Sequence, residues 1–293
     1  MKERIDVSII ILTYNTRTLT LQCLQSLSET AWGDVTKEII VVDNASNDAT
    51  VDSINKLYSD VILVRNSKNL GFAKANNIGI RRAKGRYILL LNSDTEVEKD
   101  SIPAMIAFMD SHPKAGVSTP RVLLSDGTLD PACHRGFPNP WAAFTYMSGL
   151  ERLFPKSRLF SQYHLGYKTM TLAHTIDVPS GAFFLVRRVV IDQVGMLDED
   201  YFMYGEDIDW AYRIKEKGWE IWFNPQTSIH HKKKQSGRAN AGSMMKRKTD
   251  AYFYETMKLF YKKHYEKVYP RLVTGLVYLA LDLRITVLSV LGK

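Results

Sequence analysis

The 293-residue sequence contains little cysteine and lacks two common phosphate-binding fingerprints. Its two cysteines, Cys23 and Cys133, are too few for a disulfide scaffold or a cysteine-rich zinc site, and they suit a reducing compartment. No Gly-x-Gly-x-x-Gly follows the first strand-like run, where residues 13–17 are TYNTR, and no Gly-x-x-x-x-Gly-Lys-Ser/Thr occurs anywhere. We therefore expect neither a dehydrogenase-type dinucleotide site nor an ATPase-type phosphate loop.

A long uninterrupted apolar run is also missing. Residues 272–292 are apolar apart from Asp282 and Arg284, and two central charges argue against a spanning helix, which needs about 20 predominantly apolar residues. The first six residues lead straight into a strand-like segment and include Glu3 and Asp6, so we expect no signal peptide. With 45% hydrophobic and 24% charged residues, the composition is that of a globular chain that buries a core.

The positive charge is concentrated in the C-terminal tail. Residues 232–293 hold 14 Lys and Arg against 4 Asp and Glu, whereas the preceding 231 residues hold 25 and 27. A basic tail indicates an anionic partner, such as nucleic acid, a phospholipid surface or a phosphorylated substrate. Residues 252–269 mix lysines with seven Tyr and Phe, a composition typical of helices that lie on a membrane surface. The alternative is a helix packed on the rest of the chain or on a second subunit.

Apolar runs and helical spacing alternate along the first hundred residues. This alternation predicts an α/β fold with a mostly parallel sheet flanked by helices. Beyond it, scattered prolines and aromatics over about 125–175 predict an irregular insertion, and the Gly-, Ser- and Ala-containing basic stretch 232–248 predicts a loop. The predicted strands are 7–12, 38–42, 61–64, 87–91, 181–186 and 220–223, and the predicted helices are 18–27, 72–83 and 207–217.

Polar side chains follow three of the predicted strands at the point where each strand ends. They lie at residues 13–15, 43–44 and 92–94. Because ligands of such sheets bind outside the carboxyl ends of the strands, we expect the three clusters to meet at one edge. Asp94 suits an Mg²⁺ or Mn²⁺ ion that also binds a diphosphate, although a plain turn-forming role for Asp43 and Asp94 stays open.

A second polar cluster, residues 205–210 (GEDIDW), packs three carboxylates into the start of a predicted helix. Acidic residues in a first turn are stabilised by the helix dipole, so capping alone is one interpretation. The other is a general base acting on an alcohol, because aromatic side chains at 201, 202, 204 and 210 surround the carboxylates. His230 and His231 follow the last predicted strand, and metal ligation competes with an inert surface role for them.

Six motifs in series resemble those of family 2 glycosyltransferases, which have the GT-A (Rossmann-like) fold. The resemblance runs from Val7 to about Ser236 and implies a GT-A domain over 1–236, with the insertion at about 125–175. Residues 237–293 are then a basic loop and an amphipathic C-terminal helical appendage. The motifs are VSIIILTYN (7–15), IVVDNAS (40–46), NLGFAKANN (69–77), LNSD (91–94), GA (181–182) and GEDID (205–209).

The resemblance implies transfer of a sugar from a nucleotide donor to an acceptor hydroxyl, with inversion at the anomeric carbon. Asp207 matches the catalytic base, and Asp94 and His231 match metal ligands for Mg²⁺ or Mn²⁺, with His230 as an alternative. Glu206 and Trp210 are assigned to the acceptor. Asn92 stands where the family's metal motif begins with a carboxylate, which implies fewer or weaker metal ligands. The nucleotide-sugar contacts are assigned to Thr13, Tyr14, Asn15, Asp43, Asn69, Asn76, Asn92, Ser93 and Asp94.

Within the family, the NLGFA and NSD segments resemble the rhamnosyltransferase branch of bacterial cell-surface polysaccharide synthesis. That branch implies dTDP-L-rhamnose as donor and a glycan or polyprenyl-diphosphate-linked acceptor, for a cytoplasmic protein, peripheral at the inner face of the membrane and with a homodimer as an open option. A catalytically silent nucleotide-sugar-binding or assembly subunit is the alternative that Asn92 keeps open. A nucleic-acid-binding protein would leave the clustered carboxylates without a role, so no nucleic-acid partner is expected.

Overall fold

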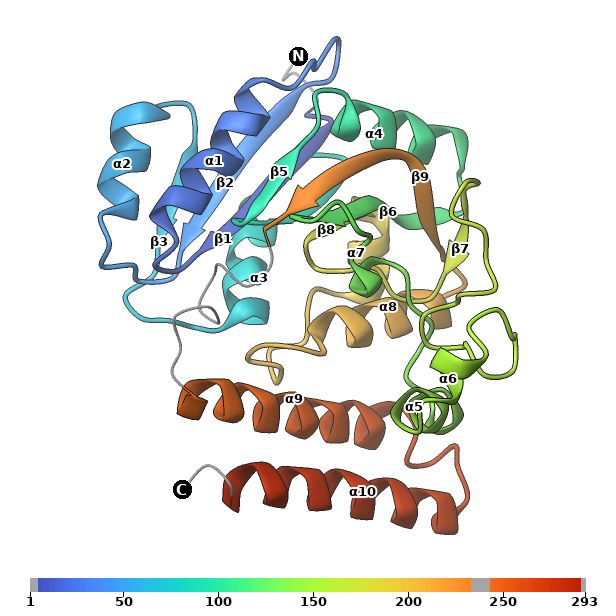
Figure 1. The fold of residues 1–293 in the computed structure, drawn as a ribbon. Helices are drawn as coiled ribbons and strands as arrows, with labels where there is room; N and C mark the ends of the chain where they lie inside the picture. Colours follow the sequence, from blue (N-terminus) through green and yellow to red (C-terminus); the bar gives the residue numbers. More distant parts are fainter. Residues whose placement is uncertain (1–4, 233–242, 291–293) are drawn as a thin grey trace.

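The computed structural model describes residues 5–232 and 243–290, and its centre is one nine-stranded mixed sheet (Figure 1). Eight strands follow the order β3-β2-β1-β4-β8-β6-β9-β5, and β7 pairs with β9. The strands are β1 (Val7–Thr13), β2 (Lys37–Asp43), β3 (Ile62–Arg65), β4 (Tyr87–Asn92), β5 (Thr95–Val97), β6 (Ala115–Leu124), β7 (His174–Ile176), β8 (Phe183–Arg187) and β9 (Glu220–His231).

Helices flank this sheet and extend beyond it at the C-terminal end of the chain. The sheet and its helices confirm the predicted α/β class. The helices are α1 (Arg17–Ser28), α2 (Thr50–Leu57), α3 (Phe72–Arg82), α4 (Ser101–Ser111), the 3₁₀ turn η1 (Pro131–Cys133), α5 (Pro140–Met147), α6 (Leu150–Leu153), α7 (Arg188–Val194), α8 (Glu206–Glu216), α9 (Ser243–His264) and α10 (Arg271–Val290).

Strands β1, β2 and β4 form the parallel part of the sheet together with β3. Their apolar runs are buried almost without interruption, as expected for strands covered on both faces. In register, Thr13 pairs with Asp43 and Leu12 with Asn92, so the strands end together. The predicted convergence of the strand-end clusters at one edge is therefore confirmed.

The rest of the sheet is mixed, and β6 and β9 form a second parallel pair within it. Strand β8 is antiparallel to both neighbours, β4 and β6, and β5 and β7 are antiparallel to β9. The predicted strand over 220–223 is only the beginning of β9, which continues to His231. Pro225 lies inside this strand, and the pairing of β6 with β9 shifts register between Pro120 and Arg121, an irregularity that accommodates the proline.

The predicted irregular insertion contains short regular pieces, namely η1, α5, α6 and β7. Most of the predicted loop over 232–248, and the proposed domain boundary at 236/237, fall on residues 233–242, outside the described residues. Both cysteines are buried and free.

The C-terminal helices α9 and α10 form a hairpin that packs on α8 (Figure 1). Helix α8 lies between the sheet and α9, and α10 forms the outermost layer. Within residues 5–232 and 243–290, no helix is both long and apolar enough to cross a membrane. One face of α10 nevertheless exposes a row of apolar side chains, at Leu272, Leu276, Leu279, Leu283 and Val287.

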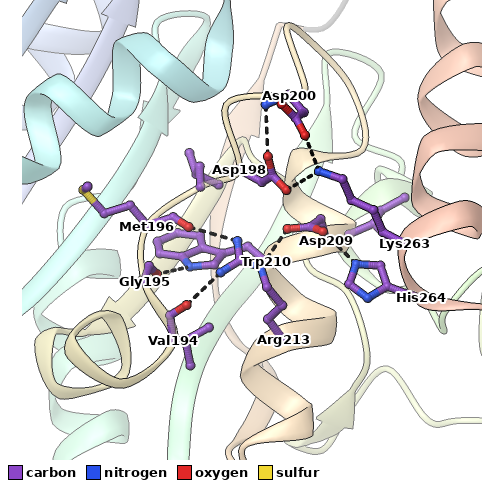
Figure 2. Close-up of polar contacts among 12 residues, drawn as sticks. Val194, Gly195, Met196, Asp198, Asp200, Asp209, Trp210, Arg213, Lys263 and His264 are labelled. Atoms are coloured by element: carbon purple, nitrogen blue, oxygen red, sulfur yellow. Dashed lines mark hydrogen bonds and ion pairs between the residues drawn. The ribbon is translucent and has the colours of Figure 1, made fainter.

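A buried ionic network holds α9 against α8 (Figure 2). Asp209 of α8 accepts hydrogen bonds from Arg213 Nε at 2.8 Å and from His264 of α9 at 2.7 Å. Burial alone would raise the pKa of Asp209, but the bonds from His264 and Arg213 outweigh burial and lower it. Beside this network, Lys263 of α9 reaches Asp198 and Asp200. The carboxylate of Asp209 therefore connects α8 to the hairpin through His264 of α9.

We expect Asp209→Asn to lower the free energy of unfolding at pH 7 by about 3–5 kcal/mol, because it removes the charge of a buried carboxylate that holds the guanidinium of Arg213 and the ring of His264. Since the pKa of Asp209 is lower when the protein is folded, its stabilisation is complete above the unfolded value near 3.8 and fades as the pH falls below it. The free energies of unfolding of variant and parent, measured in urea, should therefore converge in acid.

Asp282→Asn, which breaks an exposed pair with Lys258 of α9, is the control and should cost at most about 1 kcal/mol. Equal losses in the two variants would contradict the assignment.

Candidate active site

Hydroxyl groups connect the ends of β1 and β4. Thr13 Oγ1 lies 3.0 Å from Thr16 Oγ1 and 2.8 Å from Thr20 Oγ1, and Thr16 Oγ1 lies 3.2 Å from Ser93 Oγ. All four groups are buried. The side chain of Thr13 thus holds the first turn of α1 to the β4–β5 connection, which leaves its backbone and its neighbours to face a ligand.

Hydrogen bonds that involve side chains connect the loops after β1 and β2. Asn15 adopts a left-handed backbone with φ of 53°, donates its N–H to Ser46 Oγ and accepts from Asn47 N–H at 2.8 Å. Asp43 is buried and accepts from the N–H of Ser46. Tyr14, which precedes this tie, is 47% exposed. These hydrogen bonds hold the two loops in a fixed arrangement, and the ring of Tyr14 remains free to contact a ligand.

Asn69 and Asn76, both assigned to the donor pocket, have different surroundings. Asn69 Oδ1 accepts from Asn44 Nδ2 at 2.8 Å and from Gly71 N–H at 2.9 Å, so it shapes the loop that follows β3. Asn76 is buried within α3 and donates to the carbonyl of Phe72 one turn earlier. Its amide is therefore occupied inside the helix rather than directed at an open pocket.

Asp94 and His231 meet across the pair of strands β5 and β9. His231 Nε2 lies 3.2 Å from Asp94 Oδ1, and His231 Nδ1 lies 3.2 Å from Asp130 Oδ2. His230 points to the other face of the strand, where it is exposed and 3.7 Å from Glu98. Because successive strand residues face opposite sides, only His231 reaches Asp94.

Asp94 and His231 are the candidate ligands for the divalent metal that the sequence predicts. Burial alone would lower the pKa of His231, but its hydrogen bonds to Asp130 and Asp94 raise it to about 9. A divalent ion would take the place of the Nε2 proton between His231 and Asp94, while Asp130 orients the ring from the other nitrogen. In the described part of the chain, no three His, Cys, Asp or Glu side chains lie where they could hold a metal ion by themselves. This donor set therefore suits Mg²⁺ or Mn²⁺, which share their coordination with substrate phosphates.

Asp207 lies in the first turn of α8, paired with a buried arginine. Asp207 Oδ2 is 2.6 Å from Arg135 Nη2, and Oδ1 accepts from the N–H of Ile208. Arg135 also donates to the carbonyls of Ala132 and Pro179. Burial opposes the charge of Arg135, but the Asp207 carboxylate outweighs it, so the pKa of Arg135 is raised. The guanidinium and the helix N-terminus thus hold Asp207 as a fixed carboxylate.

One short segment contacts both the Asp94–His231 pair and Asp207. Asp130, which orients His231, and Arg135, which holds Asp207, lie at the two ends of the turn around η1. Asp130 also caps that turn by accepting from the N–H of Ala132. Two residues of one short segment therefore contact His231 and Asp207.

The two residues assigned to an acceptor differ in what they can contact. Glu206 is buried; burial and repulsion from Asp207 raise its pKa to about 8, and its Oε2 has no hydrogen-bond partner among the described residues. A neutral carboxyl without a partner is a group that an acceptor hydroxyl could satisfy. Trp210 is fully buried, stacks on Phe184 and donates to the carbonyl of Gly195. Its predicted acceptor contact is therefore wrong, and its role is to pack α8 on the sheet.

The comparisons with known proteins agree with this geometry. The family model described as "Glycosyl transferase family 2" matches residues 8–195. The chain is similar to the N-acetylglucosaminyl-diphospho-decaprenol L-rhamnosyltransferase of Mycobacterium tuberculosis (strain CDC 1551 / Oshkosh), with 28% identity over 244 residues that cover 74% of this chain and 73% of the relative.

Two solved structures show the same fold. The mannosyltransferase PcManGT from Pyrobaculum calidifontis, in complex with GDP-Man and Mn²⁺, matches with a TM-score of 0.63 and 16% identity, covering 99% of this chain and 74% of that one. S. aureus TarS matches with a TM-score of 0.58 and 17% identity over 87% of this chain, which spans only 39% of the length of TarS. At such identities these likenesses establish the fold alone.

Proposed function

Because the chain belongs to glycosyl transferase family 2 and has its GT-A fold, we propose that it moves a sugar from a nucleotide-diphosphate donor to an acceptor hydroxyl, with inversion at the anomeric carbon. It is a glycosyltransferase, and the rhamnosyltransferase of Mycobacterium tuberculosis supports the predicted branch. The observation that supports the proposed mechanism is the segment 130–135, in which Asp130 contacts His231 of the Asp94–His231 pair and Arg135 contacts Asp207.

The donor is proposed to lie along the carboxyl edge of β1, β2 and β4. Tyr14 and Asn15 border the base, Asp43 accepts from the base or ribose, and the 92–94 turn faces the diphosphate. Asn69 contributes indirectly to the donor site, because its hydrogen bonds hold the loop that follows β3. Asp94 and His231 would hold an Mg²⁺ or Mn²⁺ ion, which when bound would stabilise the charge that develops on the leaving nucleoside diphosphate. The Mn²⁺ in the complex of the archaeal mannosyltransferase supports this choice.

Asp207 is proposed as the base. Its carboxylate accepts the proton of the acceptor hydroxyl as that oxygen attacks the anomeric carbon from the face opposite the leaving group. Arg135 fixes the position of the carboxylate, while Glu206 contacts the acceptor beside it. Because the bond to the leaving group weakens in the same step, only a modest base strength is required.

For the donor and acceptor we propose dTDP-L-rhamnose and a glycan carried on a polyprenyl diphosphate, in bacterial cell-surface polysaccharide synthesis. The name of the mycobacterial relative, which specifies an L-rhamnosyl transfer to a diphospho-decaprenol-linked sugar, supports both. The basic tail supports peripheral contact with the inner face of the membrane, where such an acceptor lies. We further propose that residues 1–236 catalyse transfer and that 237–293 serve the acceptor side.

A thermal-shift panel of nucleotide sugars with Mn²⁺ tests the donor. At a hundredfold excess over Kd, a bound donor adds about 2.7 kcal/mol of stability, so dTDP-L-rhamnose should raise the melting temperature more than UDP-GlcNAc or GDP-mannose. Chelation of the metal should reduce the shift. A larger shift with another nucleotide sugar would replace the proposed donor, and a shift without any turnover would favour the silent binding subunit.

A further inference from the structure

An apolar cavity, partly open to solvent, lies between the insertion and the C-terminal hairpin. Its volume is about 560 Å³, within the range of pockets that bind small organic molecules. The walls come from the segment around α5 and from both helices of the hairpin, and no lining residue carries a charge. They include Pro138, Phe144 and Met147 from the insertion and Met257, Phe260 and Val277 from the hairpin.

The cavity borders the groups that flank Asp207. Met257 lies against Gly205, where an added Cβ would come within 3.4 Å of its terminal methyl, and Gly205 caps the helix that Asp207 begins. On the other side, the lining residue Tyr163 interacts with the guanidinium of Arg135, the partner of Asp207. A molecule in this cavity would therefore lie close to the groups that flank the proposed base.

The mouth of the cavity is apolar as well. Phe144, Tyr146 and Met147 of α5 are 49–55% exposed, and Leu276 of α10 is 59% exposed, although all four line the cavity. Leu276 belongs to the exposed row of α10 described above. The apolar surface is thus continuous from the row on α10 to the interior beside the site.

The apolar walls of the cavity favour a hydrocarbon over a sugar or a nucleotide. A sugar or a nucleotide would lose hydrogen bonds to water there and find few replacements, which costs several kcal/mol for each buried group left unpaired. A branched hydrocarbon chain has no such groups and gains from burial. Since the cavity also borders the groups that flank the proposed base, we infer that its occupant is a hydrocarbon attached to the acceptor.

We propose that this cavity binds the isoprenoid chain of a polyprenyl-diphosphate-linked acceptor. The inference rests on the proposed function for the acceptor, and it adds the place where the lipid part lies. The hairpin is then one wall of the acceptor site rather than a separate appendage.

Equilibrium dialysis with radiolabelled farnesyl diphosphate, a short and soluble isoprenoid, tests the site. Excess inorganic diphosphate and EDTA are included so that diphosphate binding at the donor edge does not contribute. The parent protein should bind the probe saturably. Leu276→Asp should weaken binding about tenfold or more, because a carboxylate at the mouth is poorly tolerated beside a buried hydrocarbon. Leu283→Asp, an equally exposed change on α10 outside the cavity, should leave the affinity within about twofold, well under the 1.4 kcal/mol of a tenfold change.

A second variant fills the cavity from α5. Ala143→Trp should also abolish binding, and Ala107→Trp on α4 is its matched control, with melting curves to show that each variant folds. No saturable binding by the parent, or equal affinities for Leu276→Asp and Leu283→Asp, would overturn the inference. Capture by anionic vesicles without binding of the soluble probe would also overturn it, in favour of a membrane-docking face.

The two proposals fail separately. If farnesyl diphosphate binds but no nucleotide sugar does, the proposed function is wrong and the isoprenoid site stands. If sugar transfer to a water-soluble acceptor proceeds but the probe does not bind, the site is wrong and the function stands.

Discussion

Asp207→Asn is expected to lower kcat by about 10²–10⁴-fold, the range for loss of a positioned general base. The amide keeps the shape of the carboxylate but cannot take the proton of the acceptor hydroxyl. Initial rates with saturating donor and Mn²⁺ measure the loss. Asp192→Asn, an exposed change on α7, provides the matched control and should retain full activity.

The pairing with Arg135 adds a second effect that must be measured apart from catalysis. The amide leaves the buried guanidinium without its counter-charge, so we expect a lower melting temperature as well. The donor-induced thermal shift should persist, because Asp207 lies on the acceptor side of the site. Near-normal turnover in a folded, donor-binding Asp207→Asn protein would show that another group is the base.

The second large effect concerns the proposed metal pair. We expect His231→Ala to reduce Mn²⁺-dependent transfer by about 10²–10³-fold, because a divalent ion supplies several kcal/mol of stabilisation to the leaving group. Asp130→Asn, which keeps both ligands but loses the orienting carboxylate, should weaken Mn²⁺ affinity by about 10–100-fold.

His230→Ala is the matched control, since it removes the neighbouring imidazole from the opposite face of β9. Its Mn²⁺ titration should be unchanged. Activity and the donor-induced thermal shift are both followed against Mn²⁺ concentration. Identical titrations for His230→Ala and His231→Ala would remove His231 from the metal site.

Much of the donor edge could be predicted from the sequence because the signals there are local. The apolar runs before Thr13, Asp43 and Asn92 are long enough to fix three parallel strands, and the sheet topology then places their ends together. The end of β9 was harder to predict, since Pro225 interrupts the run. Only the paired strand shows that the chain continues to His231 and reaches Asp94.

Two contacts of the candidate site depend on pairings that no local pattern encodes. Asp130 meets His231 across 101 positions and Arg135 meets Asp207 across 72, and neither residue lies in a motif with a characteristic spacing. The error at Trp210 has the same origin. Its place among carboxylates and aromatics suggested a ligand contact, but α8 is covered by the sheet and by α9, so little of the helix remains for a ligand.

The shared walls of the apolar cavity also constrain how the protein can change. Helix α5 comes from the middle of the chain and the hairpin from its end, yet they enclose one space. A chimera that took only one of these two segments from a relative would line the cavity with side chains that do not pack against each other. Recombination that preserves the interior must therefore carry both segments together, while the nucleotide-facing strands can stay with the parent.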